Sequence, residues 1–372
     1  MNRPEDRWGR TADQSRGPDQ APGTDQAPGS NQTLRLEEPV ASPEAPWASM
    51  ENPRATLSRR RVLSGGLQVL GATSLAGAPG SLSLFAPART ALAASNAITV
   101  TPLTPKEMGG LTLLQGAGCN VVAMPGPEGA LLIDGGLATN SRALLKAMEK
   151  ATGSNRVSTL INTHWHPEQT GSNFAIGSKG GVIIAHEVTR LYEGRKASSV
   201  CYEGTYGPLP EKARATKTTR TSGSLEFAGR HVAYDYLPAA HTDGDLYVHF
   251  PEANLLVAGG PVTGNSWPVL DIHNGGWLGG LVRAYEKLAS VVKPDTRIVP
   301  ADGKLLTGAD IIRYHDIYQK LFAQMFVFFN KGYGRSDAVA ARPLKEHESE
   351  LGDPSVFLAG AYQSLMQAYV PD

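Results

Sequence analysis

Three histidines are the residues of this sequence best suited to chemistry. His164 and His166 stand two positions apart, directly after the apolar stretch Val157–Ile161. On a tight loop this spacing aims both imidazole rings at one point, where neutral imidazoles bind a metal ion. His241 follows a second apolar stretch, 232–237, and is the third candidate ligand. Three histidines with an open fourth position are typical of a catalytic zinc site rather than a structural one.

Residues from about 100 to 332 resemble the metallo-β-lactamase superfamily of hydrolases. The resemblance rests on four segments that follow one another as the family's motifs do: 132–136, 163–171, 241–245 and 298–303. It implies an α+β fold, a four-layer αββα sandwich with metal at the edges of the sheets. It also implies that His164, His166 and His241 are metal ligands, with Zn²⁺ as the ion.

The family's second metal site is altered at every position of this sequence. The family motif H-x-H-x-D-H has Glu168 in place of its Asp and Gln169 in place of its last His. Gly260 replaces the bridging Asp, and Asp302 replaces a late His. A bridging carboxylate holds two cations together against their repulsion, so its loss predicts one tightly bound zinc. Oxygen ligands from Glu168, Gln169 and Asp302 would still suit a harder or weaker second ion. Asp134 is expected to support a ligand rather than to bind metal, whereas both roles stay open for Asp302.

Glu168 is the expected catalytic residue. Zinc on three neutral imidazoles lowers the pKa of its bound water toward ~7, and the resulting hydroxide would attack an ester, thioester, lactone or amide carbonyl. Glu168 would orient that water and transfer its proton to the leaving group of a small-molecule substrate. Alternatively, Glu168 accepts a hydrogen bond from a ligating histidine. Two alternatives concern the whole protein: a non-catalytic member of the fold that binds metal or ligand, and a non-haem iron enzyme, which would prefer two histidines and a carboxylate.

Several other side chains have more ordinary expectations. Cys119 is expected to be a small buried apolar residue, whereas Cys201 is a weaker candidate for lining a pocket. Trp165 and Trp267 are expected to form an apolar wall of the substrate pocket. His273 follows the lost bridging position, which makes it a candidate surrogate ligand.

The elements expected around these residues alternate between strands and helices. Hairpins are expected over 121–133, 225–237 and 246–258, single strands over 157–161, 182–185 and 298–299, and helices over 141–151, 187–192, 278–292, 311–329 and 358–369. Hairpins mixed with helices in both halves favour two sheets covered by helices, the four-layer sandwich. The polar segment 195–223 is too long for a plain connection and is expected to form an active-site flap.

The first 94 residues are expected to lie outside this domain, which would span 95–372. Residues 1–57 repeat Asp-Gln-Ala-Pro-Gly and lack apolar periodicity, which predicts disorder. In 58–94 the pair Arg59 and Arg60 precedes a weakly apolar stretch and a small-residue cleavage site near Ala94. This order resembles a twin-arginine signal, which predicts export to the periplasm or beyond by the twin-arginine translocation machinery. Translation from Met50 is the alternative start.

Composition excludes several classes of protein. The 35 Lys and Arg residues equal the 35 Asp and Glu residues, a balance that argues against binding nucleic acid. Two cysteines exclude a disulfide-rich scaffold and a cysteine-based zinc cluster. Glycines break the apolar stretch 65–85, so no stable membrane span is expected there.

Overall fold

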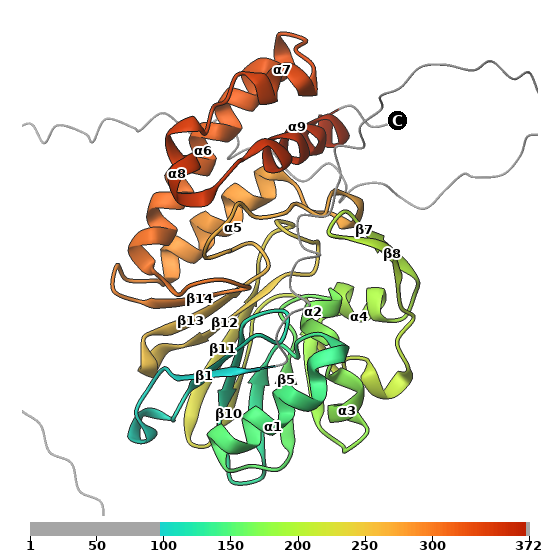
Figure 1. Cartoon of the computed structure of the whole chain (residues 1–372), viewed down its shortest axis with the longest axis vertical. Helices are drawn as coiled ribbons and strands as arrows, with labels where there is room; N and C mark the ends of the chain where they lie inside the picture. Colours follow the sequence, from blue (N-terminus) through green and yellow to red (C-terminus); the bar gives the residue numbers. More distant parts are fainter. Residues whose placement is uncertain (1–96, 370–372) are drawn as a thin grey trace, which may run out of the picture. The chain divides into compact units, whose positions relative to one another are not determined.

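The computed structural model describes residues 97–369, all of which belong to one unit of the chain, Ser49–Asp372. The expected disordered segment 1–57 and the expected export signal 58–94 lie outside the described residues. Figure 1 shows two β-sheets with helices around them.

The first sheet has seven strands, antiparallel from β1 to β4 and parallel from β4 to β9. In spatial order these are β1 (Thr99–Pro102), β2 (Thr112–Gln115), β3 (Val121–Met124), β4 (Ala130–Ile133), β5 (Val157–Ile161), β6 (Val182–His186) and β9 (Lys217–Thr219). The expected hairpin of β3 and β4 is confirmed. Strands β1 and β2 were missed, because β1 is short and exposed throughout and β2 contains only two apolar residues.

The second sheet has six strands in sequence order. They are β10 (Gly223–Phe227), β11 (Arg230–Tyr236), β12 (Leu246–Phe250), β13 (Leu255–Gly259), β14 (Arg297–Pro300) and β15 (Leu306–Thr307). Neighbours are antiparallel except β13 and β14, which are parallel. Both hairpins expected in this region are confirmed.

Two apolar clusters explain why the inner strands of the first sheet are continuous runs of apolar residues. Adjacent residues of β2 point to opposite faces, as strand geometry requires. Leu113 packs in the cluster between the two sheets, together with Val257 of β13. Leu114 packs in a second cluster, with Leu144 and Met148 of helix α1 (Ser141–Thr152). Because both faces of β3 and β4 are covered, alternation of apolar and polar residues is absent there.

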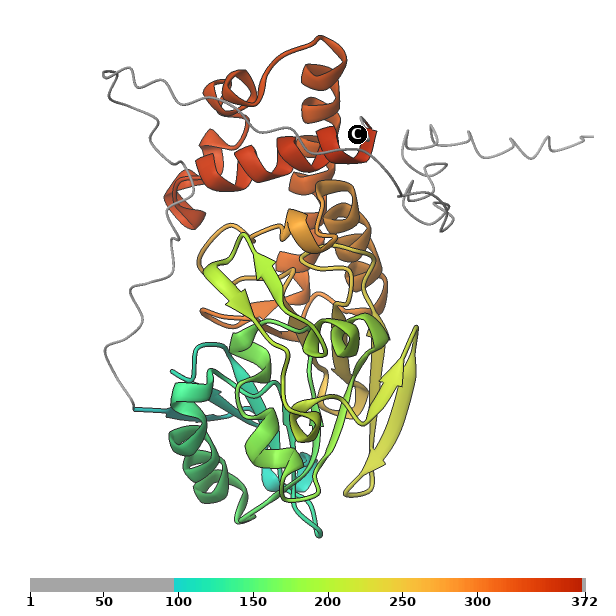
Figure 2. The same cartoon turned by 90° about the vertical axis from the view of Figure 1, so that its right-hand side faces the viewer.

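Helices complete the sandwich on its outer sides. The helices that follow strands of the first sheet are α1, α2 (Pro167–Thr170), α3 (Asn173–Gly177) and α4 (Glu187–Glu193). Those after the second sheet's strands are α5 (Leu278–Val291), α6 (Gly308–Asn330), α7 (Arg335–Ala340), α8 (Glu348–Leu351) and α9 (Ser355–Tyr369). In Figures 1 and 2 the orange and red C-terminal helices gather at one end, where α6 and α9 pack on α5. The expected α+β sandwich is confirmed.

The cap of α6 is as expected, whereas the flap differs in detail. The helix expected over 311–329 begins at Gly308, and Thr307 is its expected N-cap, in a reciprocal capping box with Asp310. The expected flap contains a two-stranded hairpin, β7 (Ala197–Ser199) and β8 (Tyr202–Tyr206), while β9 joins the first sheet. Within residues 97–369, no helix combines the length and the apolar character needed to cross a bilayer.

Candidate metal centre

The three candidate histidines come from two loops, one for each sheet. His164 and His166 lie between β5 and α2, and His241 lies between β11 and β12. A backbone hydrogen bond of 2.7 Å from Leu246 N–H to the Thr163 carbonyl ties the start of β12 to the first loop. The edges of the two sheets are therefore joined where the histidines stand.

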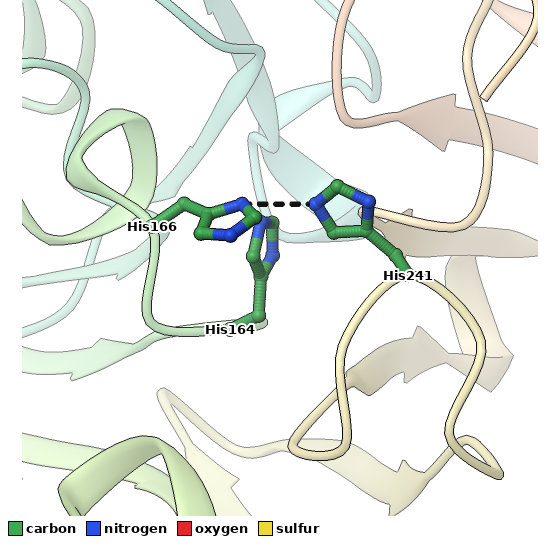
Figure 3. Close-up of side chains that lie close together, drawn as sticks. All are labelled: His164, His166 and His241. Carbon is green, nitrogen blue, oxygen red and sulfur yellow. Dashed lines mark hydrogen bonds between the residues drawn. The ribbon is translucent and has the colours of Figure 1, made fainter. Parts of the chain in front are cut away.

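The structure brings the three imidazole rings to one point (Figure 3). Their centroids are 4.7–4.8 Å apart, and the ring planes are nearly perpendicular, at 79–89°. One ring nitrogen from each lies within 4.8 Å of the other two. His164 and His166 are each 2% exposed and His241 is 7% exposed. Zinc bonds imidazole nitrogen at about 2.0–2.1 Å, so two nitrogens on one ion are at most about 4.2 Å apart. The 2.9 Å between His166 Nδ1 and His241 Nε2 is within this limit.

Hydrogen bonds orient two of these rings. The Thr163 hydroxyl donates to Asp134 Oδ2 at 2.9 Å, so its oxygen accepts the Nδ1–H of His164 at 3.1 Å. His241 Nδ1 lies 2.6 Å from the carbonyl of Val269, which can only accept. Both rings therefore carry their proton on Nδ1, and the lone pair on Nε2 belongs to the cluster. Asp134 thus acts on His164 through Thr163 and does not line the cavity at the cluster. Burial raises the pKa of Asp134 to about 7.

His166 is oriented the other way round. Its Nε2 donates to Asp271 Oδ2 at 2.9 Å, which leaves the lone pair on Nδ1. Asp271 is fully buried and also accepts from Asn274 Nδ2 at 2.8 Å. Burial alone would raise the pKa of Asp271, but the hydrogen bonds from His166 and Asn274 hold it below the usual value. A carboxylate behind a histidine is the arrangement that fixes metal ligands in proteins.

The positions of the ring protons show whether the three histidines suit a metal ion. His166 Nδ1 and His241 Nε2 face each other at 2.9 Å. Both atoms present lone pairs once the outer nitrogens hold the protons, and two facing lone pairs repel each other. Only a shared proton or a cation between them relieves this contact. The donor set, three neutral nitrogens, is one that zinc prefers. The residues fit the metal.

The expected second-site residues line the same small cavity, of about 30 Å³. Glu168, Gln169 and Asp302 form part of its wall. Among the described residues, Glu168 and Asp302 belong to no group of three metal-binding side chains. A Cβ atom on Gly260 would lie 2.2 Å from His241 Cδ2 and 3.0 Å from His164 Cε1. A bridging carboxylate at this position is therefore sterically excluded by the rings themselves.

Three expectations about neighbouring residues are wrong. Trp165 and Trp267 do not form a pocket wall, because each stacks elsewhere: Trp165 on Tyr192 and Trp267 on Phe357. Trp165 stands between two histidines that face the cluster, so its own ring points away. His273 is exposed and does not line the cavity.

The residue that matters near His273 is Asp271, which the sequence did not single out. The short turn Ile272–Asn274 buries Asp271 and Asn274 and turns His273 outward. The sequence of 271–276 predicts a turn near the site. It does not show whether Asp271 or His273 is the residue that points inward.

Both cysteines of the chain line the cavity. Cys119 is 5% exposed and packs with apolar residues, as expected. Its thiol donates to the Glu168 carbonyl at 2.9 Å, and burial raises its pKa well above the ordinary value. Cys201 is half-buried in the β7–β8 turn. Its sulfur lies within 4.8 Å of a ring nitrogen of His166 and of a carboxylate oxygen of Asp271.

A two-sheet sandwich with a cluster of three histidines at its edge defines a class of αββα proteins suited to binding metal. The sequence model of the metallo-beta-lactamase superfamily matches residues 114–300, half of the chain. The chain belongs to this superfamily.

Two solved structures are similar to this chain, and the first of them supports the fold. The sec-alkylsulfatase Pisa1 from Pseudomonas sp. aligns with a TM-score of 0.53 and 14% identity over 70% of this chain and 49% of that chain. The chain thus spans about half the length of that enzyme. A metallo-beta-lactamase from Pontibacter korlensis aligns with a TM-score of 0.45 and 18% identity, over 60% of this chain and 94% of that chain. A comparison with curated proteins found no match.

Proposed function

We propose that this protein is a zinc-dependent hydrolase with one metal ion on His164, His166 and His241. The observation that carries the proposal is the convergence of one ring nitrogen from each histidine, with His166 Nδ1 and His241 Nε2 2.9 Å apart. Bound zinc would supply the Lewis acidity that hydrolysis of an ester, thioester, lactone or amide needs at neutral pH. Gly260 supports a single ion, because a bridging side chain has no room there.

Glu168 is the proposed general base. It occupies the first turn of α2 and lines the cavity beside the histidines. Within the described residues, its Oε2 atom is buried and has no hydrogen-bond partner. A buried carboxylate oxygen without a partner is costly, so a polar group that arrives with the substrate would stabilise it. A water molecule is such a group: Glu168 would accept its proton during attack and return that proton to the leaving group.

The β7–β8 hairpin would serve as the cover of the site. Asn274 Nδ2 donates to the Ser198 carbonyl at 2.7 Å, and the Tyr206 hydroxyl lies 3.0 Å from the Thr170 hydroxyl. The hairpin is thereby attached to the residues behind His166. A cover of this kind excludes bulk water, which strengthens electrostatic interactions inside the site.

The decisive experiment combines metal analysis with a substrate panel. Protein produced and loaded in the cell should contain about one zinc per chain and hydrolyse at least one member of a panel of esters, thioesters, lactones and β-lactams. Zinc content of one per chain with no turnover across the panel would favour the alternative, a metal-binding member without catalysis. Two tightly held ions per chain would contradict the single-metal site.

We propose in addition that the protein is exported by the twin-arginine route, on the strength of the sequence of 58–94. Replacing Arg59, Arg60 and Arg61 by lysine should trap the precursor in the cytoplasm, because the receptor reads the arginine pair and not its charge. Fractionation and N-terminal sequencing measure the outcome. Unimpaired export of the triple variant would contradict this route.

A further inference from the structure

A larger cavity, of about 380 Å³, adjoins the histidine cluster. It lies between the 115–120 loop and the loops at 265–266 and 302–303, and we call it the antechamber. The antechamber and the small cavity share four lining residues: Gly118, Cys119, Glu168 and Asp302. Its volume falls in the range of small-molecule sites. A substrate whose reacting bond faces the histidines would therefore extend into the antechamber.

The charged groups of the antechamber are all negative. Glu168 and Asp302 line it, and among the described residues no lysine, arginine or histidine does. Lys304, two positions beyond Asp302, is exposed and is not part of the lining. The negative charges also affect the thiol of Cys119. Burial is the main cause of its raised pKa, and the charges of Asp134, Glu168 and Asp302 raise the pKa further.

Two neutral amides in the lining are already committed to the protein. Gln115 Nε2 donates to Asn120 Oδ1 at 2.9 Å and to the Gly303 carbonyl at 3.1 Å. Asn120 Nδ2 donates to the Pro300 carbonyl at 3.0 Å and to the Gly303 carbonyl at 3.2 Å. These donors hold the 300–303 loop, which carries Asp302. They are not directed at a ligand, so an anion in the antechamber would meet two carboxylates and, among the described lining residues, no cationic side chain.

We propose that the antechamber selects substrates in which a cationic group, such as an ammonium, extends from the scissile carbonyl. This inference rests on the proposed hydrolase function. The carbonyl would face the histidine cluster and the cation would lie beside Asp302, a carboxylate that the proposed catalytic steps do not use. Attraction at a few ångströms in a partly water-excluded site favours the cation, and repulsion of anions adds to the discrimination.

Three p-nitrophenyl esters of equal chain length test the inference. The acyl groups are 4-trimethylammoniobutanoyl, its neutral isostere 5,5-dimethylhexanoyl, and the anionic glutaryl. The zinc-loaded full chain should show its highest kcat/KM with the cation and its lowest with the anion. Asp302→Asn should reduce the preference for cation over isostere about 5- to 30-fold, as expected for loss of one nearby charge. Asp302→Glu, which keeps the charge, should retain it. Asp316→Asn, an exposed carboxylate on α6, is the matched control and should change nothing.

A binding measurement separates this inference from the proposed function. Methyl ketones of the same three acyl groups lack a leaving group, and calorimetry measures their binding without turnover. Tighter binding of the cationic ketone, lost in Asp302→Asn, supports the antechamber even if no ester is hydrolysed, a result that would contradict only the hydrolase. Hydrolysis of all three esters with equal kcat/KM, or a preference for the anion, overturns the inference while the hydrolase stands. Equal binding of the three ketones also overturns it.

Discussion

The two walls of the cavity differ in how far the protein satisfies its own polar atoms. On the histidine wall, each ring has an outer nitrogen held by an oxygen, from Thr163, Asp271 or Val269. On the wall formed by Glu168 and Gln169, the atoms Glu168 Oε2 and Gln169 Oε1 are buried without hydrogen-bond partners among the described residues. Hydrogen bonds within the protein therefore orient the histidine wall. The two oxygens of the Glu168 wall would gain hydrogen-bond partners only when a water molecule or a ligand binds.

The difference between the two walls predicts which mutations should change metal affinity and which should change turnover. Changes on the histidine wall should alter metal affinity, because the hydrogen bonds there fix the ligands. Changes on the Glu168 wall should alter turnover while metal remains bound. The predictions that follow test this separation, from the largest effect to the smallest.

The largest effect is expected from removing a ligand. His241→Ala should abolish tight zinc binding, because two imidazoles without a third leave a zinc ion poorly held. Elemental analysis after dialysis measures the content. His231→Ala, which changes an exposed histidine paired with Glu226, is the matched control and should keep about one zinc per chain. Unchanged zinc in His241→Ala would show that the third ligand is assigned wrongly.

Glu168→Gln should leave zinc bound and reduce turnover 10²–10⁴-fold, roughly the contribution of a general base. The assay is kcat at saturating zinc on a substrate found with the panel. Glu168→Asp should also lower the rate, because the shorter side chain withdraws the carboxylate from its position. Glu128→Gln, in the exposed turn between β3 and β4, controls for the loss of charge. Full activity of Glu168→Gln at saturating zinc would remove this residue from the mechanism.

Asp271→Asn should weaken zinc affinity ~10–100-fold, since the amide is a poorer acceptor for His166 Nε2–H and relaxes the ring orientation. Competition with a chelator of known affinity measures the change. The rate at saturating zinc should fall much less than in Glu168→Gln. A variant with normal affinity and a rate lowered as strongly as in Glu168→Gln would break the separation between the two walls.

The smallest effect is expected at Gly260. Gly260→Ala would press a methyl group against the rings of His241 and His164, so it should lower the stability by ~1–3 kcal/mol and weaken zinc binding. Thermal unfolding with and without zinc measures both. Gly360→Ala, in α9 with no atom within 4 Å of the added carbon, is the control and should be neutral or stabilising. Zinc affinity unchanged in Gly260→Ala would show that the rings move freely.

Much of the fold could be predicted because its signals are local. The β3–β4 hairpin has a glycine- and proline-rich turn between apolar runs, and the start of α6 has the Thr307–Asp310 capping box. The short strands β7 and β8 lie in a polar segment and were missed, since cross-strand pairing and contacts to Asn274 stabilise them. Such contacts join residues far apart in the chain and leave no local pattern.

By itself, the sequence predicted the fold class and singled out the three histidines that the structure brings together, because apolar runs, turn signals and motifs such as 163–171 are properties of short segments. The tertiary structure decided which nitrogen of each ring faces the cluster, that Asp271 rather than His273 turns inward, and that Gly260 leaves no room for a bridging group. Each of these depends on contacts between residues far apart in the chain, and those contacts form only when the sheets and their loops pack together.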